Sequence, residues 1–215
     1  MKSFITRHKD NFVLTVYLLG YVLLWPIITK YMDIGTFKIE IQIGFLILLS
    51  ILLLIFYKSQ IFVRRGFGYL GGLLTGIGAY FLSIVITIIL FSFLPNINVG
   101  NSAIQQGFNE YPNLMFICSC ICGPFIEEIA FRHCLYNKIS GNLNSTGLSV
   151  TITSLLFGAA HCIPFILTGN YVFLWRTILY LPLAFMCQLE YNRDGDLREC
   201  VLTHVIYNIL SVCMK

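Results

Sequence analysis

About seven stretches of roughly twenty mostly apolar residues follow one another along this chain, and they restrict its fold more than any other feature. A helix needs roughly 20 such residues to cross the hydrocarbon core of a bilayer. Hydrophobic residues make up 57% of the chain and charged residues only 11%, whereas a soluble domain has about 25% charged residues. We therefore predict an all-α, polytopic transmembrane helical bundle. The predicted spans are Asn11–Ile28, Ile39–Tyr57, Gly68–Leu94, Tyr111–Tyr136, Gly147–Leu167, Tyr171–Leu189 and Leu197–Met214.

The third and fourth stretches are longer than one span requires, so the count becomes eight if either contains a second helix. Pro124 lies inside the fourth stretch and predicts a break or a helix start there, because proline lacks the donor that a helix interior needs. The connections are short and show no internal repeat. We therefore expect residues 1–215 to form a single integral-membrane domain.

The basic residues predict how the bundle is oriented, because cytoplasmic loops are enriched in Lys and Arg. With the N-terminus inside, the outer side has Lys30, Lys38 and Lys215, with Arg176 near that face. Seven spans with this bias predict a cytoplasmic N-terminus and an outer C-terminus, and an eighth span would move the C-terminus inside. The predicted cytoplasmic residues are Lys2, Arg7, Lys9, Lys58, Arg64, Arg65, Lys138, Arg193 and Arg198.

The net charge of +4 follows from this topology and is no sign of nucleic-acid binding, because the chain has no basic stripe with interleaved aromatic residues. Eight cysteines are present, nearly all in apolar runs. Buried free cysteines behave as small hydrophobes. The partner expected from composition is therefore the lipid bilayer, and nucleic acid is not expected.

Glu127 and Glu128 lie side by side in an apolar stretch, where an ionised carboxylate costs about 2.5–3.5 kcal/mol or more. Residues four apart on a helix lie about 40° apart around its axis, and residues five apart about 140°. Arg132 is therefore the natural ion-pair partner of Glu128, while Glu127 points to another face. We predict a structural salt bridge between Glu128 and Arg132 and a chemical role for Glu127.

Two further pairs of residues that include polar side chains are also four positions apart. Phe157 and His161 share one helix face, and His204 and Asn208 share another. Polar groups in spans turn away from lipid, so these faces are expected to meet Glu127. A carboxylate and an imidazole can take a proton from water, and an imidazole with an amide can stabilise an oxyanion. Each residue alone has a simpler explanation as a helix–helix contact or core aromatic, but the set favours hydrolysis.

The three motifs Glu127-Glu128-x-x-x-Arg132, Phe157-x-x-x-His161 and His204-x-x-x-Asn208 resemble those of the CAAX protease and bacteriocin-processing family, also called the Abi family. The resemblance covers roughly Pro124–Asn208 and implies an intramembrane endopeptidase. By motif position it implies that Glu127 with His161 activates water and that His204 with Asn208 stabilises the oxyanion, with Phe157 in the pocket. The catalytic core is expected within residues 111–214, with accessory spans in 11–94.

The resemblance implies a substrate that is a membrane-associated peptide or protein. The rich use of Ile, Asn and Lys favours a bacterial plasma membrane, and with it peptide maturation or self-immunity. Two histidines and a glutamate can ligate zinc, but the family is understood as glutamate-dependent, so no cofactor is expected. Two alternatives remain open. One is a non-proteolytic scaffold or immunity protein, and the weaker one is an ion-coupled transporter, which inverted repeats would favour.

Overall fold

The computed structural model describes residues 2–27, 38–61, 68–93, 102–167 and 175–214, and every regular element within these ranges is a helix. The first helix, α1 (Lys2–Leu14), continues into η1 (Thr15–Leu24), whose wider turns are π-helical. Two long helices follow, α3 (Lys38–Ile61) and α4 (Tyr69–Phe93). A short α5 (Ser102–Glu110) precedes the second half of the chain.

The second half begins with one continuous composite helix of 29 residues, Pro112–Ser140. Its pitch changes along its length, through α6 (Pro112–Ile117), η3 (Cys118–Cys122), α7 (Gly123–Glu128), η4 (Ile129–Tyr136) and α8 (Asn137–Ser140). The remaining helices are α9 (Thr146–Ala160), α10 (Ile163–Leu167), α11 (Arg176–Asp194) and α12 (Leu197–Cys213).

Four of the seven predicted spans form helices that are long and apolar enough to cross a bilayer: His8–Ile27, Ile39–Ile61, Tyr69–Phe93 and Pro112–Ser140. The other three predicted spans correspond to α9, which is apolar but only 15 residues long, and to α11 and α12. The predicted all-α polytopic bundle is confirmed, with helices of unequal length. The orientation of the bundle remains a prediction.

Three boundaries differ from those predicted. Pro124 does not break its helix, because the wide turns of η3 precede it and the N–H of Gly123 bonds to the carbonyl of Cys118. The predicted span Gly147–Leu167 ends early, since α9 stops at Ala160 and a turn at His161 leads into α10. In the predicted span Tyr171–Leu189, residues 171–174 lie outside the described residues, and α11 runs on to Asp194.

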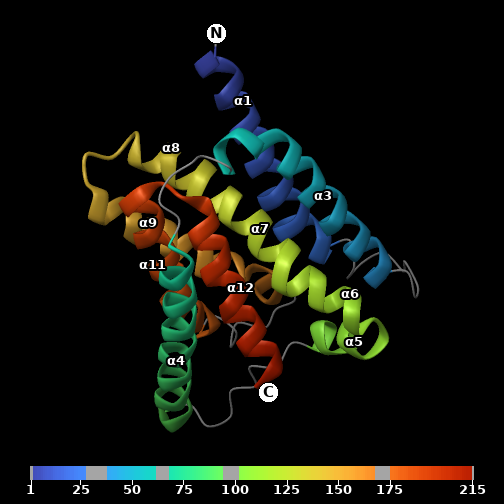
Figure 1. Ribbon diagram of the computed structural model, residues 1–215. Helices are drawn as coiled ribbons and strands as arrows, with labels where there is room; N and C mark the ends of the chain where they lie inside the picture. The colour runs from blue at the N-terminus through green and yellow to red at the C-terminus, as the bar shows by residue number, and fades with distance from the viewer. Residues whose placement is uncertain (1, 28–37, 62–67, 94–101, 168–174, 215) are drawn as a thin grey trace.

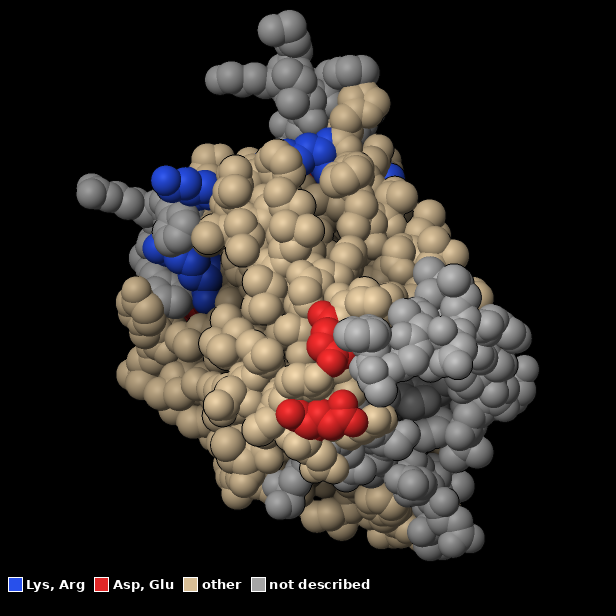
Figure 2. Space-filling view, turned by 90° about the vertical axis from the view of Figure 1, so that its right-hand side faces the viewer, with Lys and Arg blue, Asp and Glu red and all other residues tan. Residues whose placement is uncertain are grey.

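Several residues used to predict the orientation also lie outside the described ranges, among them Lys30, Arg64 and Arg65. On the described part of one face, Figure 2 shows the visible Lys and Arg side chains in the upper half and acidic side chains lower down, with a broad uncharged surface between them. Large apolar side chains such as Leu48 and Ile55 of α3 are exposed. An uncharged belt of this kind suits contact with lipid.

Helix α12 lies in the middle of the second half, between α4 and the composite helix, while α9 packs against α11 (Figure 1). Glycines on α4 allow α12 to approach closely. A Cβ atom on Gly72 would lie 3.1 Å from the carbonyl oxygen of Glu199, and one on Gly76 would lie 2.6 Å from that of Thr203. Thr203 also donates a hydrogen bond of 3.0 Å to the carbonyl of Gly72. Small residues at helix interfaces permit such packing in membranes.

We predict that Gly76→Ala destabilises the protein by about 1–3 kcal/mol, because the added methyl group overpacks the α4–α12 interface. Gly78→Ala on the same helix is the matched control, since a Cβ atom there meets nothing within 4 Å. Thermal unfolding of the purified proteins in detergent measures both variants. Equal unfolding midpoints would show that α4 does not hold α12 in place.

Candidate active site

Glu127 lies near the middle of the composite helix, at the end of α7, where its side chain is 15% exposed. Its Oε2 atom faces two imidazole rings from two other helices. It lies 3.5 Å from Nε2 of His161 and 3.8 Å from Nε2 of His204. Oε2 is buried and has no hydrogen-bond partner among the described residues. The structure therefore brings the predicted acid and both predicted imidazoles together.

His161 follows Ala160, the last residue of α9, and the end of the helix places it beside Glu127. A helix of 15 residues is only about 22 Å long, less than the roughly 30 Å of a hydrocarbon core. Nδ1 of His161 lies 2.8 Å from the carbonyl oxygen of Phe157. A carbonyl only accepts, so Nδ1 must carry a hydrogen and donate. Neutral His161 therefore presents the lone pair of Nε2 toward Glu127.

His204 on α12 is held by the other glutamate. Its Nδ1 atom lies 2.7 Å from Oε1 of Glu128, and the side chains of both residues are almost fully buried. An ionised carboxylate only accepts, so Nδ1 donates and Nε2 is directed toward Glu127. The spacing of the sequence predicts only the salt bridge of Glu128 with Arg132, and the structure adds this contact between two helices.

Arg132 on η4 lies against Glu128, with Nε 3.0 Å from Oε2. It is 1% exposed and donates through Nη2 to the carbonyl of Ala184 on α11, at 3.2 Å. Its guanidinium carbon lies 4.4 Å from the ring centroid of Phe157. Arg132 is thus an interior cation that contacts a carboxylate, a carbonyl and an aromatic face.

Phe157 is the residue around which the site packs. It is fully buried, and its ring contacts those of Phe131, His161 and His204 at centroid distances of 5.1, 4.7 and 5.7 Å. Such edge-to-face and tilted contacts are favourable for aromatic pairs. The position predicted as a pocket residue therefore supports both histidine rings at once.

Asn208 lies one turn after His204 on α12, but its amide is already engaged. Its Nδ2 atom donates to the carbonyl of Ser119 on η3, at 2.9 Å. An amide nitrogen has two hydrogens, so the bond to Ser119 uses one and fixes the direction of the other. Asn208 also ties α12 to the composite helix.

Tyr17 of η1 is a site residue that the three motifs do not include. It is 3% exposed, its hydroxyl lies near the carboxylate of Glu127, and its ring packs edge-on against Phe131. Tyr21, four residues later, stacks on Tyr17 and accepts a hydrogen bond from Gln42 of α3. Two tyrosines at i and i+4 in a predicted span were the available signal.

Among the described residues, no group of three or more His, Cys, Asp or Glu side chains is arranged so that it could hold a metal ion. The seven cysteines of the buried interior and Cys213 are all free. The absence of a cofactor remains a prediction.

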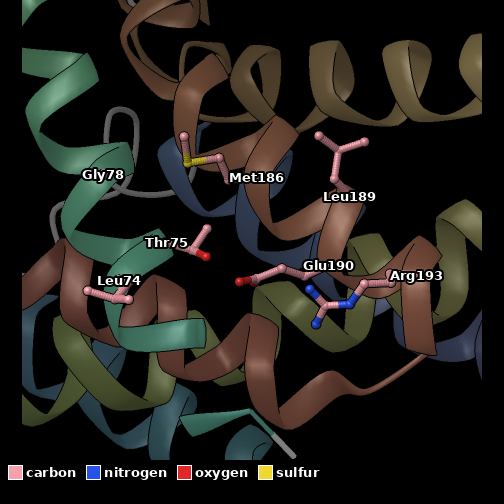
Figure 3. Close-up of a pocket in the computed structure, with 7 residues that line it drawn as sticks. All are labelled: Leu74, Thr75, Gly78, Met186, Leu189, Glu190 and Arg193. Carbon is pink, nitrogen blue, oxygen red and sulfur yellow. The ribbon is translucent and has the colours of Figure 1, made fainter. Parts of the chain in front are cut away.

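A separate pocket of about 470 Å³ lies between α4 and α11, away from Glu127 (Figure 3). Glu190 points across it toward Thr75, with Arg193 beside it. The Glu190 carboxylate lies 2.8 Å from the hydroxyl of Thr203, and Arg193 is bound to Asp194 and Glu199. The polar groups of this pocket thus already have partners within the protein, and it contains none of the motif residues.

We predict that Arg132→Met destabilises the protein by about 3–5 kcal/mol, because removing one partner of a buried ion pair leaves the charge of Glu128 uncompensated. Arg198→Met is the control, since the ion pair of Arg198 with Asp196 is more exposed and such pairs contribute about 0–1 kcal/mol. Thermal unfolding in detergent measures both. Similar losses in the two variants would contradict the importance of the interior pair.

Comparison with known proteins gives relatives of bacterial origin. The UPF0177 protein YaiH of Lactococcus lactis subsp. lactis is 31% identical over 100 residues, which are 46% of this chain and 37% of the relative. An uncharacterized protein of Mycoplasma capricolum is 28% identical over 130 residues, 55% of this chain and 35% of the relative. The UPF0177 protein in the abiGi 5' region of Lactococcus lactis subsp. cremoris is 26% identical over 191 residues, 86% and 73% of the two chains.

The chain thus spans little more than a third of the length of the first two relatives. No solved structure gives a significant match. The family model described as Type II CAAX prenyl endopeptidase Rce1-like matches residues 109–210. This segment contains all three motifs, together with η4, α9, α11 and most of α12. Over this segment, which is a little under half of its length, the chain is similar to the Rce1-like type II CAAX prenyl endopeptidases.

Proposed function

We propose that the protein is an intramembrane, glutamate-dependent endopeptidase that cleaves a membrane-associated peptide or protein. The observation that carries this proposal is the position of Glu127, whose buried Oε2 atom faces the Nε2 atoms of His161 and His204 at 3.5 and 3.8 Å. A carboxylate flanked by two imidazoles in an apolar interior is suited to proton transfer.

Glu127 and His161 are assigned the activation of water. Because Nδ1 of His161 donates to Phe157, Nε2 is left as an acceptor. A water molecule hydrogen-bonded to Glu127 and to this nitrogen loses a proton as its oxygen attacks the scissile carbonyl carbon. The proton is later delivered to the departing amine, so that the C–N bond breaks without release of an amide anion.

His204 and Asn208 are assigned to the oxyanion that forms on the carbonyl oxygen. For Nε2 of His204 to donate, the ring must carry both hydrogens, because Nδ1 already donates to Glu128. The carboxylate of Glu128 stabilises such an imidazolium, and Arg132 in turn orients Glu128. Asn208 contributes the amide hydrogen that Ser119 does not use. One well-placed donor of this kind stabilises the transition state by about 3–4 kcal/mol.

The bacterial relatives and the apolar helices support a multi-pass protein of a bacterial plasma membrane, with the N-terminus in the cytoplasm and the substrate supplied from the bilayer. Maturation of a membrane-associated peptide, or self-immunity against one, fits this placement. The proposal includes neither nucleic acid nor a resident metal.

We predict that Glu127→Gln and His161→Ala each lower the cleavage rate by about 10²–10⁴-fold, the usual contribution of a general acid or base. Purified protein in lipid vesicles is incubated with an intramolecularly quenched peptide, in S-farnesylated and unmodified form, and fluorescence is recorded. Glu110→Gln and His8→Ala are matched controls, because both side chains are exposed and distant in sequence from the motifs. Their rates stay at the wild-type value.

Glu128→Gln separates the two glutamates. Glutamine keeps an oxygen that can accept from His204 but lacks the negative charge, so a smaller loss of rate than in Glu127→Gln is expected. Loss of activity in a stably folded Glu128→Gln variant, with full activity in Glu127→Gln, would reverse the two assignments.

We also predict that exhaustive treatment with a zinc chelator leaves the cleavage rate unchanged. In the proposed mechanism Glu127 and His161 themselves take up and release the proton of the attacking water, so no metal is needed. The assay is the same peptide cleavage, with the metal content of the protein determined in parallel. Loss of cleavage that only added zinc restores would instead assign Glu127, His161 and His204 as metal ligands.

A further inference from the structure

On its own helix the His161 ring contacts Phe157, and α9 ends at Ala160, the residue before His161. The bond from Nδ1 to the carbonyl of Phe157 anchors one edge of the ring. A hydrogen bond at one atom still allows the ring to tilt about it. A general base must be held close to its productive geometry, since a displacement of about 1 Å can lower a rate by about 10²-fold.

Tyr180 of α11 supplies a contact to the face of this ring. The two ring centroids are 4.2 Å apart, and the ring planes are inclined by 30°. This distance is shorter than that between Phe157 and His161. Tyr180 belongs to none of the three motifs, and no pattern in the sequence predicts a place for it at the site.

Close packing of α9 and α11 brings Tyr180 into this position. A Cβ atom on Gly158 would lie 2.9 Å from the carbonyl oxygen of Thr177, so the two backbones touch one turn before His161. The hydroxyl of Thr177 also lies 3.1 Å from the sulfur of Cys162, immediately after His161. Thr177 and Tyr180 are three residues apart and share a helix face. The backbone contact therefore sets the separation of the stacked rings.

We propose that Tyr180 is a positioning residue for His161, acting through the face of its aromatic ring. This inference rests on the proposed function, in which His161 takes part in proton transfer. The stacked ring keeps Nε2 directed at Glu127, and its π face attracts the imidazolium that forms when His161 takes up a proton. The role needs the ring and not the phenolic hydroxyl.

The variants Tyr180→Leu and Tyr180→Phe test this directly in the vesicle assay. Leucine removes the ring and lowers kcat by about 10- to 100-fold with little change in KM, whereas phenylalanine keeps the ring and retains kcat within about twofold. Tyr69→Leu is the matched control, because Tyr69 is 70% exposed at the start of α4. Wild-type kcat in Tyr180→Leu, or equal losses in the leucine and phenylalanine variants, overturns the proposal.

A second measurement does not depend on catalysis. In NMR spectra of protein with labelled histidine, assigned with His161→Ala, the stacked ring shifts the His161 signals upfield. The shift decreases in Tyr180→Leu, where Phe157 is the aromatic ring that remains beside His161, persists in Tyr180→Phe and is reduced in Gly158→Ala, which separates α9 from α11. Gly147→Ala is the control, since a Cβ atom there meets nothing within 4 Å. A His161 signal that is the same in Tyr180→Leu and wild type refutes the stack, whereas wild-type cleavage by Glu127→Gln refutes the proposed function alone.

Discussion

The interior ion network of Glu128 is the interaction on which the site depends. Glu128 contacts Arg132 on its own helix and His204 on α12, and all three side chains are buried. In an apolar bundle each of these groups would be costly alone. Joined, they fix the composite helix against α12 and direct Nε2 of His204 toward Glu127. Arg132 extends the same network to α11 through the carbonyl of Ala184.

Unequal helix lengths complete the arrangement. The composite helix is long enough to place Glu127 near its middle, while α9 is short enough that its end meets that depth. His161 follows the last residue of α9, so its imidazole is not confined to the side of a continuous helix when it approaches Glu127. A short helix beside a long one therefore brings an imidazole to a carboxylate inside the helical bundle.

The sequence alone predicted what depends on local periodicity. The all-helical class follows from the apolar stretches, and the spacing of Glu128 and Arg132 and of Phe157 and His161 is a property of single helices. The meeting of Glu127 with His161 and His204 was expected because polar side chains turn away from lipid, but the other contacts between helices could not be predicted in this way. The bond from His204 to Glu128, the position of Tyr17 near Glu127 and the Tyr180 stack all join residues far apart in sequence. The end of α9 at Ala160 was also missed, because the apolar run continues past it to Leu167.

The pairing of Glu128 with Arg132 within one helix has a consequence for biosynthesis. Chains are made from the N-terminus, so the composite helix reaches the bilayer before α9, α11 and α12 exist. A glutamate and an arginine four residues apart can neutralise each other from the outset. The segment then needs to carry only the charge of Glu127 into lipid while it waits for its later partners. The same two residues that hold His204 in the finished protein thus ease the insertion of the helix that bears them.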